Sequence, residues 1–161
     1  MITSKRAQAW GIDLMIASII FITGIISFYL YSLNAVDQTE DKLNSLSYDG
    51  NIIGDMILSE GLPKNWNEQN VVTIGILTEN KINQTKLEKF YNMITNNYQK
   101  TKVLFNTKYD YYMLISENFT INGQIKPGLG KQPQNQRNLA KITRFVIYKD
   151  KLQNLDIYIW Q

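Results

Sequence analysis

Side chains that could do chemistry are few in this chain of 161 residues, and they are scattered along it. Histidine and cysteine are both absent, which removes imidazole acid–base catalysis, thiolate nucleophiles, disulfides and Cys/His zinc sites. The sequence contains no calcium loop, P-loop or nucleophile elbow. Its nearest glycine-rich segment, Gly128-Leu-Gly130-Lys131, lacks the following helix and the Ser/Thr of a phosphate loop. We therefore expect no catalytic residues, no metal, no cofactor and no enzyme activity.

Aromatic and basic residues do not indicate a ligand site either. Tyr109, Tyr111 and Tyr112 could form a flat surface for carbohydrate, but alternation along a strand favours core packing for them. Lys131 and Arg137 could bind an anion, but their place in a loop favours solvated side chains instead. The net charge is +3 with both signs interspersed, and no long Lys/Arg cluster of the kind that follows phosphates occurs. We therefore expect no nucleic-acid partner.

Two sequons, starting at Asn83 and Asn118, are candidate N-glycosylation sites on an extracytoplasmic chain. The first one also has a structural explanation. Its Thr85 forms a T-x-x-E capping box with Glu88, so this threonine is predicted to cap a helix.

One carboxylate, Asp13, differs from the others because it lies at the entrance of the longest apolar run. An ionised carboxylate at this depth in a membrane is costly unless it is paired or stays near the interface. Two interpretations therefore stand: a hydrated interfacial residue, or a charge that requires a partner.

The apolar run extends from Leu14 to Leu33, twenty residues without a charge. At a rise of about 1.5 Å per residue its helix is about 30 Å long, the thickness of a bilayer's hydrocarbon core. Lys5 and Arg6 precede it, so the positive-inside rule predicts a cytoplasmic N-terminus and an extracytoplasmic remainder. A cleaved secretory signal is the competing interpretation, but it requires a shorter run followed by small residues. We favour a retained single-pass anchor in the membrane lipid.

Small residues recur along this run at helical spacing. Ala17 and Gly24 are seven residues apart, and Thr23 and Ser27 are four apart. Because small residues let membrane helices approach closely, these four are candidates for helix packing.

Beyond the run, apolar residues continue at helical spacing and predict an amphipathic extension, in which Gly50 and Gly54 could mark a kink. A second amphipathic helix is predicted over about 85–105. Period-2 patterns predict strands, Asn122-Gly123 predicts a type I′ hairpin, and Asp150-Lys151 a hairpin turn. The predicted strands are 71–77, 109–116, 142–148 and 155–159, and 124–138 is predicted to be a flexible loop.

Together these elements predict an α+β fold. A long N-terminal transmembrane and amphipathic helix leads into a small domain with one further helix and a three- to four-stranded antiparallel sheet. The predicted organisation is a basic leader at 1–7, a transmembrane helix at 8–34, an amphipathic extension at 35–60 and an extracytoplasmic domain at 61–161.

The N-terminal arrangement resembles the precursors of archaeal type IV pilin-like proteins, which carry a class III signal peptide. The residues that carry the resemblance run from Ser4 to Ile20. They comprise a short basic leader, a small residue before Gln8, the acidic Asp13 and the start of the apolar helix. The resemblance covers about residues 4–34, and a long helix that leads into an antiparallel sheet is also the architecture of pilins.

This resemblance implies that a prepilin peptidase cleaves between Ala7 and Gln8 and that the apolar helix is retained. Asp13 would take the place of the acidic residue that pairs with the N-terminal amine of a neighbouring subunit. The chain departs from the family pattern in two respects. Ala7 stands where glycine is commoner, and the acid is the sixth residue after the cut instead of the fifth. A shifted cut, or no cut, therefore stays open.

The function implied by the resemblance is that of a structural subunit, major or minor, of an archaeal surface filament with a role in adhesion. Its partners would be membrane lipid before assembly, the prepilin peptidase and other pilin-like subunits. The alternative is a single-span anchored extracytoplasmic domain that binds a partner or ligand and does not polymerise.

Overall fold

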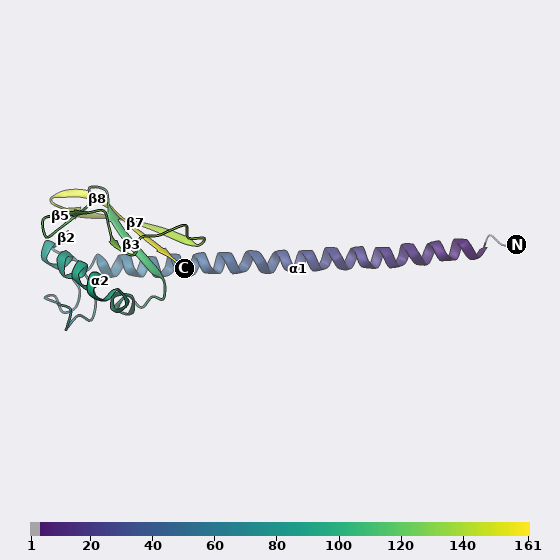
Figure 1. Cartoon of the computed structure of the whole chain (residues 1–161), viewed down its shortest axis with the longest axis horizontal. Helices are drawn as coiled ribbons and strands as arrows, with labels where there is room; N and C mark the ends of the chain where they lie inside the picture. The colour runs from purple at the N-terminus through teal and green to yellow at the C-terminus, as the bar shows by residue number, and fades with distance from the viewer. Residues whose placement is uncertain (1–3) are drawn as a thin grey trace. The chain divides into compact units, whose positions relative to one another are not determined.

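The computed structural model of the chain describes the backbone of residues 4–161 and the side chains of residues 10–33 and 40–161. The chain divides into two compact units, Met1–Asp41 and Lys42–Gln161. Its elements follow in the order α1 (Ser4–Ile57), β1 (Leu77–Thr78), β2 (Lys81–Ile82), α2 (Gln84–Leu104), β3 (Asp110–Ile115), β4 (Phe119–Ile121), β5 (Gln124–Lys126), β6 (Leu129–Gly130), β7 (Leu139–Tyr148) and β8 (Lys151–Trp160) (Figure 1).

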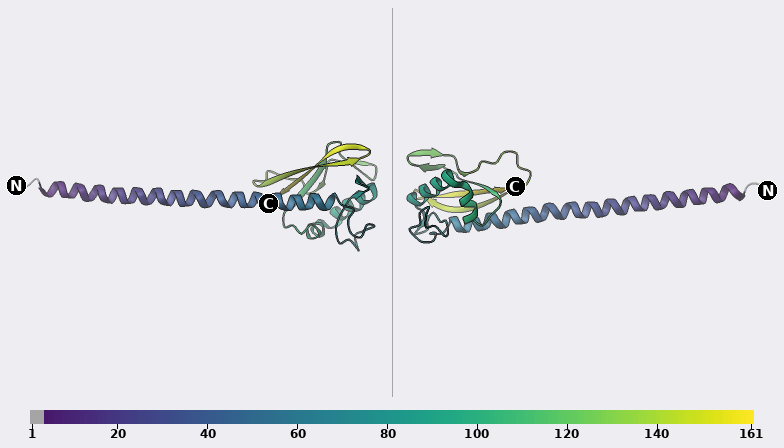
Figure 2. Two further views of the ribbon diagram at one scale, coloured as in Figure 1. Left: turned by 180° about the vertical axis from the view of Figure 1, so that it is seen from behind. Right: turned by 60° about the horizontal axis from the view of Figure 1, so that its bottom comes forward.

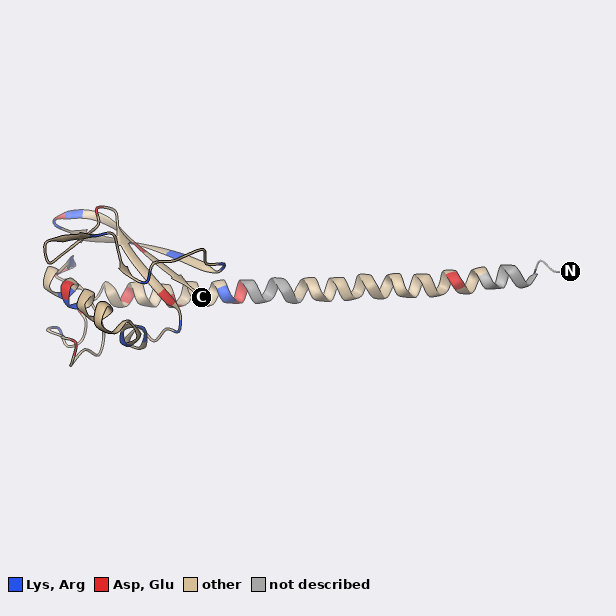
Figure 3. Ribbon diagram, viewed as in Figure 1, with Lys and Arg blue, Asp and Glu red and all other residues tan. Residues whose placement is uncertain are grey.

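The first unit consists of one helical segment, the N-terminal part of α1. Within it, Trp10–Leu33 is long and apolar enough to span a membrane, and none of its side chains is buried by the rest of the chain. Asp13 is the only charged residue of this stretch, which Figure 3 draws almost entirely in tan. A membrane-spanning helix is therefore supported by length and composition.

The second unit begins with the C-terminal part of α1, which forms the predicted amphipathic stripe. Leu46, Ile53 and Ile57 are each at most 1% exposed. Their spacing of seven and four residues places them on the helix face that is buried in the domain.

Gly50 and Gly54 do not interrupt α1, so the predicted kink is wrong. A Cβ atom on Gly50 would lie 2.3 Å from Cδ1 of Ile142 on β7, and one on Gly54 would lie 3.3 Å from Cδ1 of Ile157 on β8. The glycines therefore permit close packing of the helix on the sheet, which explains them without a break.

The main sheet has six strands in the order β1-β2-β7-β8-β3-β6, and β4 and β5 form a separate pair. The sheet is mixed. Strands β2 and β7 pair in parallel, with Lys81 opposite Ile147, and all the other neighbouring strands of the sheet pair antiparallel. The prediction of three or four antiparallel strands was wrong in number and direction. The three additional strands, β1, β2 and β6, have two residues each, too few for a period-2 pattern to be visible.

Several local predictions are confirmed. Strand β3 and the β7–β8 hairpin form where alternation predicted them. The β4–β5 turn has Asn122 and Gly123 at φ 48° and 75°, as a type I′ turn requires. The β7–β8 turn lies one residue earlier than predicted, at Lys149 and Asp150 with φ 50° and 59°.

The second helix, α2, confirms the prediction over 85–105, but its N-cap is Asn83 and not Thr85. The Oδ1 atom of Asn83 accepts a hydrogen bond from the backbone N of Lys86 at 3.1 Å. The N-cap therefore lies two residues before the T-x-x-E motif, and the helix begins at Gln84, because an asparagine cap is available there. At Asn97 the backbone is non-helical, so α2 comprises two helical stretches across a kink.

Residues 71–77 form a single bridge, Leu62 with Thr73, before β1 begins, so the strand predicted there is largely wrong. The segment instead runs beside the end of α1. The backbone N of Ile76 donates to the carbonyl of Ile57 at 3.0 Å, and that of Leu77 donates to Ser59 at 2.9 Å. Residues 124–138 are also less irregular than predicted, because β6 pairs with β3.

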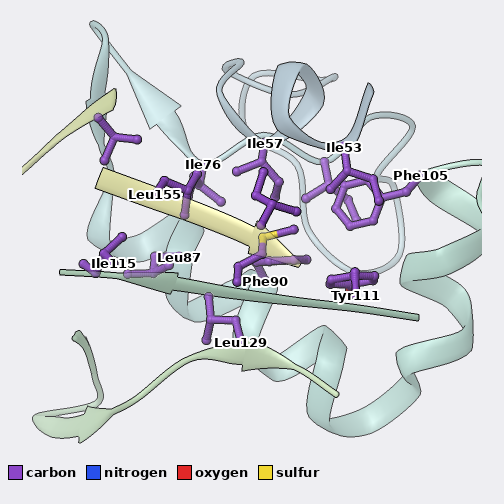
Figure 4. Packing of buried hydrophobic residues seen from close by; sticks show 14 of the residues in the cluster. Ile53, Ile57, Ile76, Leu87, Phe90, Phe105, Tyr111, Ile115, Leu129 and Leu155 are labelled. Carbon is purple, nitrogen blue, oxygen red and sulfur yellow. The ribbon is translucent and has the colours of Figure 1, made fainter. Parts of the chain in front are cut away.

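The core lies between the sheet and the helical segments of the second unit (Figure 2). Figure 4 shows Ile53 and Ile57 from α1 close to side chains from α2 and the strands. Phe105 joins the layers through edge-on contacts, with ring centroids 5.9 Å from Phe90 and 5.3 Å from Tyr111. The domain is thus held by apolar packing, without disulfides.

Asp110, at the start of β3, connects three segments through two ion pairs. Its Oδ1 atom lies 3.0 Å from the Nζ of Lys102 on α2, and its Oδ2 atom 2.6 Å from that of Lys131. Burial alone would raise the pKa of Asp110, but hydrogen bonds and charges from Lys131 and Lys102 together lower it below its ordinary value of 3.8.

A carboxylate whose pKa is lower in the folded state stabilises the fold above its unfolded pKa and loses that effect as the pH falls through its folded pKa. We therefore expect the free energy of unfolding to decrease below about pH 4. In the variant Asp110→Asn this part of the pH dependence should be absent. Urea unfolding between pH 6 and pH 2 measures both, and identical pH profiles would contradict the role of Asp110.

Candidate functional site

The candidate functional site is the apolar stretch of α1, where most of the residues singled out by the sequence lie. Asp13, Ala17 and Gly24 are separated by four and seven residues, so one face of the helix presents all three. Asp13 and Ala17 border a shallow hollow of about 330 Å³ together with Trp10 and Leu14. Nothing lies within 4 Å of the position that a Cβ of Gly24 would occupy. This face is therefore uncovered, with a carboxylate at one end and small residues along it.

The hydroxyl groups of this stretch are satisfied within the helix. Ser18 donates to the carbonyl of Leu14 and Thr23 to that of Ile19, each at 2.8 Å. Thr23 and Ser27 are both exposed and lie one turn apart beside the face of Gly24. A helix with small, internally bonded side chains can approach a second helix closely in lipid.

The predicted cleavage site falls on Ala7 and Gln8. Both residues belong to α1, but the structure does not describe their side chains. The same holds for the side chain of Asp37, beyond the other end of the apolar stretch.

In the second unit, the residues that the sequence offered as candidate ligand surfaces are buried or ion-paired within the domain. Tyr109, Tyr111 and Tyr112 are at most 9% exposed, so they belong to the core and not to an open carbohydrate surface. The hydroxyl of Tyr111 shares a hydrogen bond with Thr101, and burial raises the pKa of this tyrosine. Lys131, in the glycine-rich segment, is paired with Asp110.

Lys86 is a polar residue of the core that sequence reasoning missed. Its side chain is 8% exposed, and its Nζ atom donates to the carbonyls of Glu60 and Leu77, each at 2.8 Å. Burial lowers the pKa of Lys86. Lys89 donates in the same way to the carbonyl of Trp66 at 3.1 Å. These two lysines of α2 thus hold the segment after α1, and no periodicity in the sequence indicates such contacts.

The two sequons differ in their surroundings. The Asn83 side chain caps α2 and is partly buried, whereas Asn118 is exposed in the turn before β4 at φ 64°. A glycosyltransferase needs an accessible asparagine on a surface loop. Asn118 meets that requirement better than Asn83.

For the protein isolated from its own host, we expect the variant Asn118→Gln to lose any N-linked glycan. The matched variant Asn83→Gln should keep the glycan and lose about 1 kcal/mol of stability through the missing cap. Intact-mass measurement and denaturant unfolding of both variants test this. A glycan attached at Asn83 would contradict the prediction.

Comparison with known protein families, curated proteins and solved structures finds no match to this chain.

Proposed function

We propose that this protein is a pilin-like structural subunit, major or minor, of an archaeal type IV pilus-like surface filament. Before assembly, the apolar part of α1 would anchor the chain in the membrane. The N-terminus would be cytoplasmic, and the domain of the second unit would lie outside the membrane. During assembly the helix would leave the lipid and pack beside the helices of other copies.

The observation that carries the proposal is the uncovered helix Trp10–Leu33 with its carboxylate at Asp13. This observation counts independently of the family resemblance, because a plain membrane anchor would need only length and apolar character. A carboxylate at the entrance, on the same face as Ala17 and Gly24, suits helix association, in which the acid offsets a buried amine. The basic leader and the α+β domain that follows are consistent with the same role.

Electron microscopy of purified surface filaments, with mass spectrometry of their subunits, tests this function. The proposal predicts that the chain is a component of filaments and is recovered after they are sheared from the cells. Recovery of the chain only in the membrane fraction of cells that carry filaments would favour the single-span anchored domain instead.

A further inference from the structure

The charges of this chain are unevenly distributed along its sequence. Residues 8–41 contain four acidic residues (Asp13, Asp37, Glu40 and Asp41) and no Lys or Arg, a formal charge of −4. Residues 42–161 contain fifteen Lys or Arg and ten Asp or Glu, a formal charge of +5. Three of the four acids gather within five residues just beyond the apolar helix. In every copy of the chain, residues 8–41 are therefore net negative and residues 42–161 net positive, so these two segments of different copies attract each other.

An exposed apolar side chain follows the acidic residues closely in the sequence. Glu40 and Asp41 are exposed, and Leu43 is 39% exposed although the stripe residues Leu46, Ile53 and Ile57 are buried. We refer to residues 40–43 as the acidic segment.

A hollow of about 460 Å³ in the second unit has the complementary character. It is bordered by Asp49 of α1, by Lys102 and Val103 at the end of α2, and by Lys108 before β3. Val103 is 77% exposed, so its apolar side chain is open to a partner at the edge of the hollow. The hollow thus combines an apolar side chain with basic groups. The acidic segment combines an apolar side chain with carboxylates.

The charges around this hollow are only partly compensated. Asp49 accepts a hydrogen bond from Thr107 at 2.7 Å, and Lys102 is paired with Asp110 at 3.0 Å. The Nζ atom of Lys108 lies 5.1 Å from the ring centroid of Tyr109, and no described carboxylate is within ion-pair distance of it. An incoming carboxylate would therefore find an unpaired ammonium group at the edge of the hollow.

We propose that the acidic segment of a second copy of this chain docks into this hollow. Asp41 of one copy would pair with Lys108 of the other, and Leu43 would contact Val103. The inference rests on the proposed function, because a filament subunit must present complementary surfaces to its own copies. It adds a specific contact outside the membrane helix.

Site-directed cross-linking in native membranes tests the contact, because the chain contains no cysteine. Two full-length chains with different epitope tags carry one cysteine each, Leu43→Cys and Val103→Cys. They are co-expressed and treated with a short bis-maleimide reagent. Only a contact between copies yields a product that carries both tags. The matched control replaces Val103→Cys by Phe145→Cys, a residue of β7 that is 70% exposed.

The expected result is a two-tag product for the 43–103 pair and little for the 43–145 pair. Asp41→Lys in the first chain, or Lys108→Glu in the second, should each lower the yield about two- to fivefold, the range for an exposed ion pair. Both changes together should restore it. Equal yields with the control pair, or no restoration by the double charge reversal, would overturn the proposed contact.

The result is separable from the fate of the proposed function. Filaments that contain the chain but give no 43–103 product would overturn this contact and leave the filament role standing. A charge-dependent 43–103 product in cells that form no filaments would support the contact and contradict the filament role.

Discussion

Replacing Asp13 with alanine is expected to exclude the chain from surface filaments while its insertion into the membrane stays intact. In the proposed assembly the carboxylate of Asp13 pairs with a neighbouring N-terminal amine among packed apolar helices. Removal of one partner of a buried ion pair costs about 3–5 kcal/mol, because the other charge stays buried and uncompensated. A loss of about 3 kcal/mol per contact corresponds to a decrease in incorporation of more than about a hundredfold.

The measurement is the amount of the variant chain in sheared filaments relative to the membrane fraction. The variant Asp13→Glu is the matched control, since it keeps the negative charge and should retain incorporation. Asp13 also has a second interpretation, that of a hydrated interfacial residue. Normal filament incorporation of Asp13→Ala would support that interpretation and remove the proposed role of the carboxylate.

The largest expected effect on stability is at Trp66, in the segment between α1 and β1. Its side chain is fully buried, and its Nε1 atom donates to the carbonyl of Gly75 at 2.8 Å. The variant Trp66→Ala would leave both a large cavity and an unpaired buried carbonyl. We expect it to lower the free energy of unfolding by about 3–5 kcal/mol.

Two further variants separate these causes. Trp66→Phe retains much of the apolar volume but removes the donor, so it should cost about 1–3 kcal/mol for the unsatisfied carbonyl. Val103→Ala removes an exposed apolar side chain and should change stability little. Denaturant unfolding of the full-length chain in detergent, followed by near-ultraviolet circular dichroism, measures all three. A cost for Trp66→Ala no larger than that for Val103→Ala would contradict the packing described for this segment.

The elements predicted correctly are those specified by local patterns. The helical character of α1 and α2 follows from periods of three and four residues, and the β4–β5 hairpin follows from Asn122-Gly123. The long strands β7 and β8 alternate over ten residues each. In these segments the residues that determine the structure are close in sequence.

The errors concern structure that depends on distant residues. The β-branched run at 71–77 has the composition of a strand, but its backbone donates to carbonyls at the end of α1 and just after it, those of Ile57 and Ser59. Gly50 and Gly54 have low helix propensity, yet they let α1 pack closely against side chains of β7 and β8. Tertiary packing outweighs propensity at both places.

The candidate functional residues also divide into those that a local sequence pattern reveals and those that depend on distant residues. The apolar stretch and Asp13 can be identified from composition, because a membrane span is a contiguous property of the sequence. The hollow at Asp49, Lys102 and Lys108 cannot, because it joins the C-terminal part of α1 to residues more than fifty positions later. Lys86 is equally hidden, since main-chain carbonyls hold it and carry no sequence signature.

The intact mass of the mature chain, isolated from its own membranes, tests the central claim most directly. A pilin-like subunit is predicted to lack residues 1–7 and to begin at Gln8, with Asp13 and the whole apolar helix retained. A chain that keeps residues 1–7 would contradict prepilin-type processing and favour a plain membrane anchor. A chain that has lost the apolar helix as well would contradict both the anchor and the filament subunit.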